Sequence, residues 1–211
     1  MTTIVAIDGT AASGKGTIGK AVAKYFNFAY LDTGLIYRAV AKLSLDQNNG
    51  KLSEEIAISV AESLTIDDLD INGLRAGIIS EAASKTAEFK KVREALKNFQ
   101  KTFPEKYGSA VLDGRDIGTE IFPNANVKLY IDSSPRVRAE RRYKDRILLE
   151  KDTTFEKILQ DLIERDERDS KRQNSPLRIS EDAHLIDTTE LSIEASIRNA
   201  IQFVKFKIEN S

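Results

Sequence analysis

Hydrophobic residues along the 211-residue chain follow two alternating patterns, short apolar runs and longer stretches with helical spacing. Alternation of this kind is typical of an α/β fold with a parallel sheet. Each of the five apolar runs is followed closely by an aspartate. The runs are residues 4–7, 28–31, 109–112, 127–131 and 184–186, followed by Asp8, Asp32, Asp113, Asp132 and Asp187. We therefore expect a five-stranded parallel sheet flanked by helices, with acidic groups at the strand ends where such folds bind ligands.

Helical patterns fill the intervals between these strands. Residues 15–26 and 193–208 carry apolar side chains at helical spacing, Ser133-Ser134-Pro135 is a helix start, and Thr153 with Glu156 forms a candidate capping box. Nearly eighty residues separate the second and third strands, mostly with a helical pattern. Because a simple crossover is shorter than this, the segment is expected to hold a subdomain.

A glycine-rich segment directly follows the first strand. It fits G-x-x-x-x-G-K and continues with Gly-Thr, where the usual motif has Ser or Thr directly after the lysine. Backbone N–H groups and the start of the next helix would cradle phosphates there, and the lysine would reach the outer phosphate oxygens. The predicted ATP-binding residues are Gly9, Thr10, Ala11, Ala12, Ser13, Gly14, Lys15, Gly16 and Thr17.

Composition narrows the classes of function. The chain has 32 Lys and Arg against 33 Asp and Glu, one histidine and no cysteine, which excludes disulfides and thiolate zinc sites. The balanced charge disfavours a nucleic-acid partner, and no apolar run is long enough for a membrane span. With no secretory signal pattern at the N-terminus, the expected location is the cytoplasm. We expect a monomer, because no long apolar seam is apparent.

Cations are concentrated in residues 136–172, where 12 Lys or Arg occur with 10 Asp or Glu. Such a run is usually a solvated helical face with i,i+4 ion pairs. Here the arginines recur at helical spacing on two consecutive helices joined near residues 151–153, which suggests a hairpin that closes over bound phosphates. The predicted catalytic residues are Lys15, Arg138, Arg141, Arg142 and Arg165.

Two further segments follow strands and combine arginine with hydroxyl or carboxylate groups. The first is Asp32 to Arg38, which is also compatible with a capped helix carrying a surface arginine. The second is Asp113 to Thr119, where two carboxylates and an arginine at a strand end favour a ligand or ion site. Thr17 and Asp113 are the expected magnesium-binding residues, acting through water.

Taken together, these motifs resemble the bacterial cytidylate (CMP/dCMP) kinases over nearly the whole chain. Further matching segments are residues 89–96, 122–125, 164–169 and 185–189. The resemblance implies transfer of the γ-phosphoryl group of ATP to CMP or dCMP with Mg²⁺. It also implies one P-loop kinase domain over residues 1–211, with a nucleoside monophosphate (NMP)-binding subdomain at about 33–104 and a lid at about 138–172.

The same resemblance implies roles for individual residues. Ser84, Arg93 and Asp116 would read the cytosine; Thr33, Arg165 and Asp169 would hold the sugar region; and Arg38, Arg115 and Arg172 would bind the acceptor phosphate. The chain departs from the family pattern in two places. Thr33 replaces the more usual serine, and a small antiparallel sheet insert is trimmed near residues 65–77.

Alternative functions stay open at this point. The first is a P-loop kinase for another acceptor, such as UMP or a small metabolite, and the second is a non-catalytic nucleotide-binding module. A GTPase is disfavoured because the chain has no Asn-Lys-x-Asp motif for reading guanine.

Overall fold

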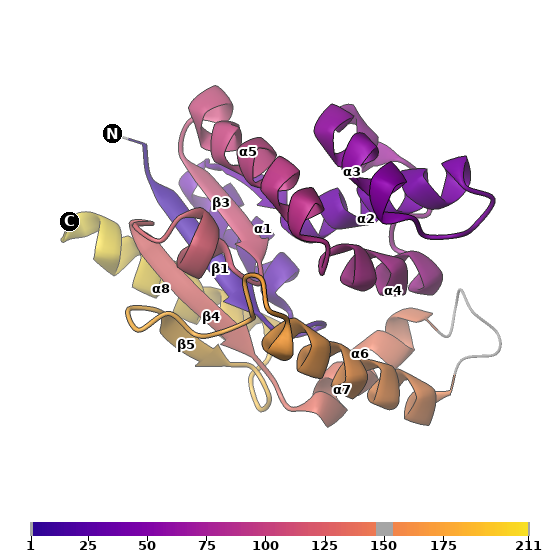
Figure 1. Cartoon of the computed structure of the whole chain (residues 1–211). Helices are drawn as coiled ribbons and strands as arrows, with labels where there is room; N and C mark the ends of the chain where they lie inside the picture. The colour runs from indigo at the N-terminus through magenta and orange to yellow at the C-terminus, as the bar shows by residue number, and fades with distance from the viewer. Residues whose placement is uncertain (1, 147–153, 211) are drawn as a thin grey trace. The chain divides into compact units, whose positions relative to one another are not determined.

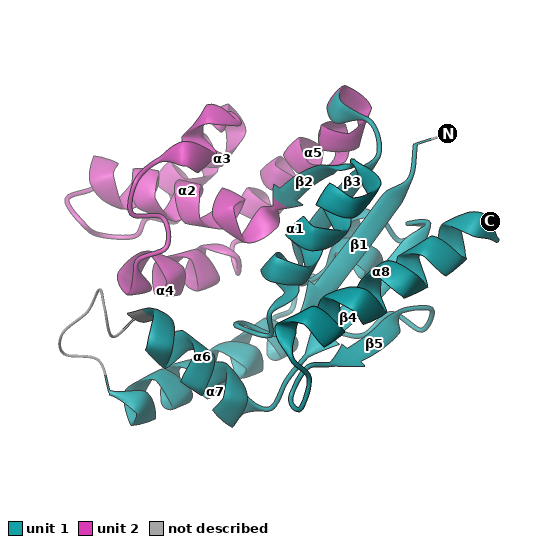
Figure 2. Ribbon diagram, turned by 180° about the vertical axis from the view of Figure 1, so that it is seen from behind, with its two compact units in different colours: residues 1–31, 107–211 teal, residues 32–106 magenta. Residues whose placement is uncertain are grey.

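The computed structural model describes residues 2–146 and 154–210 (Figure 1). The chain divides into two compact units (Figure 2). Unit 1 contains residues 1–31 and 107–211, and unit 2 contains residues 32–106. In the part of the chain that is described, no helix has the length and apolar character needed to cross a membrane.

The expected parallel sheet is confirmed, with strand order β2-β3-β1-β4-β5. Its strands are β1 (Ile4–Gly9), β2 (Ala29–Asp32), β3 (Ala110–Gly114), β4 (Val127–Asp132) and β5 (His184–Asp187). The central strand β1 pairs in parallel with both β3 and β4, and β4 pairs in parallel with β5. In this register Asp8 lies opposite Gly114 on one side and Tyr130 on the other, which brings the carboxyl ends of three strands to one edge.

Helices α1 (Lys15–Phe26) and α8 (Ile193–Glu209) cover one face of the sheet (Figure 2). Branched side chains of β1 and β4 pack there against Ile18 and Val22 of α1 and Val204 of α8. His184, at the start of β5, stacks on Phe203 of α8 with ring centroids 4.1 Å apart. This contact gives the single histidine a packing role, as its position at the start of a strand suggests.

Two further helices of unit 1, α6 (Pro135–Arg146) and α7 (Phe155–Lys171), pack against each other (Figure 1). Their small core contains Ala139, Ile158 and Leu162 and also includes Ala11 of the glycine-rich loop. The N-cap of α7 is Thr154, whose hydroxyl accepts a hydrogen bond from the amide of Lys157. Thr153 and the expected link at residues 151–153 lie outside the described residues.

Unit 2 is helical, with α2 (Thr33–Gln47), α3 (Glu54–Ser63), the 3₁₀ turn η1 (Asp67–Asp70), α4 (Gly77–Thr86) and α5 (Lys90–Tyr107, whose last residue belongs to unit 1). Helix α2 packs against α3 and α4. Small residues allow the close approach of α2 and α4, where Ala41 meets Ala82 and Ala83. Residues 65–77 contain η1 and turns but no strand.

Candidate active site

The glycine-rich segment forms a loop between β1 and α1 whose backbone path requires glycine. A Cβ atom on Gly9 would lie 1.9 Å from the carbonyl oxygen of Ile131, so no larger residue fits there. The loop turns through positive φ angles at Ala12 (61°) and Gly14 (92°). Gly14 is the N-cap of α1 and has no side chain to cap it. The first turn of α1 carries no acidic residue, so the positive end of the helix dipole faces the loop without an opposing carboxylate, which suits a bound anion.

Side chains from three other segments hold this loop in place. The Thr10 hydroxyl donates to Asp132 at the end of β4 (2.7 Å). Thr188, directly after β5, donates through its hydroxyl to the Ser13 carbonyl (3.0 Å). Arg138 of α6 donates to the Ala11 carbonyl (3.2 Å). The loop is thus fixed before any ligand binds, which lowers the entropy cost of binding phosphates.

Two of the predicted catalytic arginines are engaged by the protein itself. Arg138 is 2% exposed; besides its bond to the loop, it donates to the Ser133 carbonyl (2.7 Å) and forms an ion pair with Asp166 of α7 (2.7 Å). Arg141 donates to both the hydroxyl (2.9 Å) and the carbonyl (2.7 Å) of Thr188. These contacts tie α6 to the glycine-rich loop and to α7.

The residues present at the start of α1 suit a magnesium ion. A Cβ atom on Gly16 would lie 3.4 Å from the Oδ2 of Asp113, so this buried carboxylate approaches the backbone beside Thr17. A hydroxyl and a carboxylate are hard oxygen donors of the kind that Mg²⁺ takes alongside phosphate and water. Among the described residues, no group of three or more His, Cys, Asp or Glu could hold a metal.

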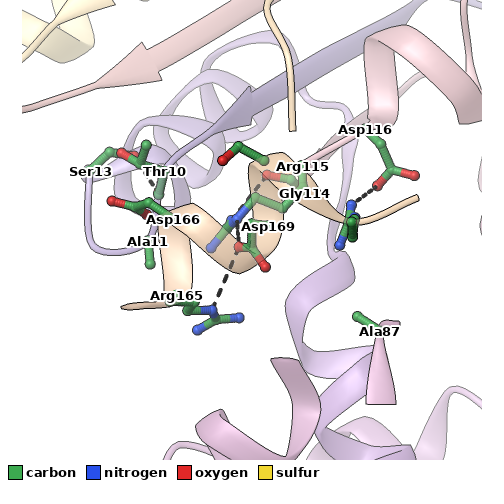
Figure 3. Close-up of polar contacts among 12 residues, drawn as sticks. Thr10, Ala11, Ser13, Ala87, Gly114, Arg115, Asp116, Arg165, Asp166 and Asp169 are labelled. Atoms are coloured by element: carbon green, nitrogen blue, oxygen red, sulfur yellow. Dashed lines mark hydrogen bonds and ion pairs between the residues drawn. The ribbon is translucent and has the colours of Figure 1, made fainter. Parts of the chain in front are cut away.

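A buried cluster of arginines and carboxylates lies where β3 ends and α7 passes (Figure 3). Asp169 lies between Arg115 and Arg165; its Oδ2 is 2.9 Å from the Arg115 Nε and 3.6 Å from the Arg165 Nε (Figure 3). Arg172 approaches Asp116, with the Arg172 Nη2 3.7 Å from the Asp116 Oδ1. Five of the predicted substrate-binding residues are therefore assembled by two segments that are about 50 residues apart in sequence.

The charges of this cluster are held by mutual pairing. Burial alone would raise the pKa of Asp169, but Arg165, Arg115 and Arg172 outweigh it and lower the pKa to about 2. Burial would likewise lower the pKa of Arg115, and Asp169 instead raises it. Asp169 and Arg115 are thus both ionised at neutral pH, and the cluster holds guanidinium groups in fixed positions, which suits recognition of a phosphate monoester.

Asp8 is a buried carboxylate at the same edge of the sheet, and its pKa shifts the other way. Burial raises this pKa to about 7, although hydrogen bonds from the amides of Gly118 and Ile117 oppose the rise. Both bonds are 2.8 Å long. The two amides belong to η2 (Ile117–Ile121), a single π-helical turn after β3. The sequence places Asp8 among the acidic groups at the strand ends but does not reveal its contacts, because its partners lie 109 and 110 residues away.

The other predicted substrate-binding residues belong to unit 2. Arg93 of α5 is 7% exposed, donates to the Ala87 carbonyl (3.3 Å) and lies over the ring of Tyr37, 5.5 Å from its centroid. Arg38 of α2 approaches Ser80 of α4 (3.4 Å). Thr33 and Ser84 are buried within this unit. Arg142, the remaining predicted catalytic residue, lies half-buried on α6 in unit 1.

Sequence reasoning missed three residues that support these sites. Asp132 and Thr188 hold the glycine-rich loop, and Asp8 holds η2. The only signal for Asp8 and Asp132 is their position directly at the end of an apolar strand. Thr188 follows such an aspartate. Their partners are set by strand order, which the apolar pattern does not give.

Comparison with known families decides which kind of kinase fold this is. Residues 5–206 match the profile of the cytidylate kinase family. The chain belongs to that family. A cytidylate kinase of Brucella suis biovar 1 (strain 1330) is 50% identical over 202 residues, covering 95% of this chain and 92% of the relative. One of Nitrobacter winogradskyi is 46% identical over 202 residues, covering 96% and 95%.

Solved structures of lower sequence similarity share the fold. An uncharacterized protein from Eubacterium ventriosum has a TM-score of 0.53 and 14% identity, with 96% of this chain and 98% of that chain covered. TT1252 from Thermus thermophilus has a TM-score of 0.51 and 16% identity, with 98% of each chain covered. At these identities the likeness supports the fold, while the family assignment rests on the cytidylate kinase relatives.

Proposed function

We propose that this protein transfers the γ-phosphoryl group of ATP to CMP or dCMP, giving ADP and CDP or dCDP. The observation that carries the proposal is the pairing of a preformed phosphate loop with a buried arginine–carboxylate cluster at one sheet edge, in a chain of the cytidylate kinase family. The loop binds the phosphates of the donor ATP, and the cluster binds the anionic acceptor.

On the donor side, the amides of residues 9–17 and Lys15 bind the ATP phosphates. Arg138 and Arg141 act here as positioning residues, since their guanidinium groups hold the loop and Thr188. Thr17 and Asp113 would hold Mg²⁺ through water, and the ion would neutralise charge on the phosphate oxygens. Arg142 and Arg165 complete the positive surroundings of the transferred group.

On the acceptor side, the family resemblance assigns Arg38, Arg115 and Arg172 to the CMP phosphate. Asp116, Ser84 and Arg93 read the cytosine, while Thr33, Arg165 and Asp169 hold the sugar. A hydrogen-bonded base pocket discriminates strongly, because a wrong base leaves buried polar groups without partners.

The reaction needs no strong general base. The attacking oxygen of CMP is already anionic, so alignment of the two substrates and electrostatic stabilisation supply most of the rate. In this proposal residues 138–172 act as a lid, residues 33–104 act as the NMP-binding subdomain, and the protein works as a cytoplasmic monomer.

A panel of acceptors tests this function. ADP formation from ATP is measured with CMP, dCMP, UMP and AMP, and the expected result is a kcat/KM for CMP or dCMP at least about a hundredfold above that for AMP, since a wrong base leaves buried groups without partners. Equal rates for all four acceptors would overturn the assignment. ADP release without any acceptor would favour a hydrolase.

A further inference from the structure

The first two amides of η2 are capped by a residue from a different strand. The N-cap residue, Asp116, makes no hydrogen bond from its own side chain to this turn, although aspartate is among the preferred N-cap residues. Instead, the Oδ1 of Asp8 accepts from the Ile117 amide and its Oδ2 from the Gly118 amide, both at 2.8 Å. Asp8 thus takes over the capping that Asp116 would otherwise perform.

Because Asp8 caps the turn, the side chains of Arg115 and Asp116 have other partners. The Asp116 carboxylate approaches Arg172 (3.7 Å), and Arg115 binds Asp169 (2.9 Å). Both contacts are made to groups at the C-terminal end of α7. The turn therefore presents to α7 the residues that the proposed function assigns to the acceptor.

The turn also packs tightly against its support. A Cβ atom on Gly118 would lie 3.1 Å from the Cδ of Lys128 and 3.4 Å from the Asp8 Oδ2. Asp8 itself is 5% exposed. Because the backbone of the turn lies this close, a substitution of Asp8 shifts the turn, since there is little room for water to take the place of the carboxylate.

The glycine-rich loop does not depend on Asp8 in the same way. Its anchors are Asp132, Arg138 and Thr188, which contact the loop directly. The two halves of the site are thus held by separate sets of bonds, although Asp8 precedes Gly9 in sequence.

We propose that Asp8 is a positioning residue for the acceptor nucleotide, whose carboxylate fixes the turn from Arg115 to Gly118 so that Arg115 and Asp116 face the monophosphate substrate. This proposal rests on the proposed function, because it takes that substrate to be CMP or dCMP. Asp8 does not touch the reacting atoms; it acts through the turn.

Asp8→Asn is the most direct test. Asparagine offers one acceptor oxygen and one NH₂ group, so one of the two buried amides of η2 would face a donor instead of an acceptor. Capping of that amide by the Asp116 side chain then becomes favourable. We expect the KM for CMP to rise about tenfold or more, and the KM for ATP to stay within about twofold. An equal rise in both KM values would overturn the proposal.

Thr10→Val is the matched control on the donor side, since it removes the hydroxyl that binds Asp132. It is expected to raise the KM for ATP more than the KM for CMP, the reverse of Asp8→Asn.

A double-mutant cycle adds a second criterion. If Asp8 acts through Asp116, Asp8→Asn in an Asp116→Ala background has little further effect on the KM for CMP, whereas fully additive effects contradict this route.

Amide hydrogen exchange in the substrate-free protein separates this proposal from the proposed function. Asp8→Asn should speed exchange at Ile117 and Gly118 about tenfold or more, with the amides of β1 unchanged. Unchanged exchange at both amides overturns the role of Asp8. A wild-type protein that is inactive on CMP overturns the proposed function but does not affect the exchange result.

Should Asp8→Asn fail to fold, Asp8→Glu is used for the kinetic test, because it displaces both acceptor oxygens by one methylene. The expected result is again a rise in the KM for CMP without a matching rise in the KM for ATP.

Discussion

Two buried carboxylates at one sheet edge have pKa values shifted in opposite directions, and their neighbours explain the difference. Asp169 faces three arginines, which lower its pKa to about 2. Asp8 has only two backbone amides in direct contact, with Asp116 opposing its charge and Arg115 favouring it, so burial dominates and raises its pKa to about 7. Tyr130, opposite Asp8 on β4, has a pKa raised to about 12 by burial and by Asp132 and is neutral at physiological pH.

The raised pKa of Asp8 predicts how stability depends on pH. Between about pH 4 and pH 7 the folded protein keeps a proton on Asp8 that the unfolded chain has lost, so this residue's contribution to stability falls as the pH rises through that window. The difference between the two pKa values corresponds to about 4 kcal/mol.

Urea unfolding of the wild type and Asp8→Asn at several pH values isolates this effect, because the asparagine does not titrate. The free energy of unfolding of the wild type minus that of the variant should fall by about 4 kcal/mol from about pH 4 to pH 8. A difference that does not change with pH would mean that Asp8 keeps its ordinary pKa. Asp169 contributes in the opposite sense, losing its stabilisation as the pH falls from about 4 through 2.

At the scale of elements, the loop after β5 links the glycine-rich loop to α6. The Thr188 hydroxyl donates to the Ser13 carbonyl and accepts from Arg141. We predict that Thr188→Val raises the KM for ATP about tenfold, because the loop loses one buried anchor and the arginine loses one acceptor.

Thr189→Val is the matched control for this prediction. The Thr189 hydroxyl binds Asp187 and the Ser134 amide rather than the glycine-rich loop. Steady-state kinetics with ATP varied should therefore separate the two variants. Equal ATP KM values for the two variants would contradict the role of Thr188 in anchoring the glycine-rich loop.

The elements themselves could be predicted from the sequence because each strand is a short apolar run closed by aspartate. The observed strands agree to within two residues; β2, for example, spans Ala29–Asp32 where the pattern indicates residues 28–31. The turn η2 could not be predicted, since Asp116-Ile117-Gly118 reads as loop. Its amides are held by Asp8, 109 and 110 residues away.

Helical spacing shows which arginines share a face but not what that face meets. It groups Arg138 with Arg141 and Arg142, yet Arg138 is buried against Ala11 and Asp166. Only the packing of α6 on the loop and on α7 reveals this. The contacts of Arg138 and Arg141 therefore come from the structure, whereas the sequence motifs already single out Arg115, Arg165 and Asp169 of the buried cluster.

For the whole molecule, the net charge is nearly zero, but the positive charges are unevenly placed: 12 of the 32 Lys and Arg lie in residues 136–172. Lys15 supplies the cation of the glycine-rich loop, and the proposed acceptor side has Arg115 directly after β3, Arg165 in α7 and Arg172 directly after α7. We predict that Lys15→Ala lowers kcat by about a hundredfold or more with the fold retained, because it removes a fixed charge that stabilises the transition state.

Lys24→Ala is the control, since Lys24 is exposed in the last turn of the same helix. Circular dichroism melts and kcat measured with saturating ATP and CMP compare the two variants. A Lys15→Ala enzyme with a rate near that of the wild type would contradict the assignment of this loop to the ATP phosphates.

Phosphoryl transfer between the two nucleotides is the central claim for this molecule, and ³¹P NMR of the wild-type protein with ATP, Mg²⁺ and CMP follows it directly. The predicted result is that the γ-phosphate signal of ATP declines while the signals of ADP and CDP grow at equal rates, with no inorganic phosphate beyond the background without enzyme. Growth of inorganic phosphate in place of CDP, or no loss of the ATP signal, would contradict it.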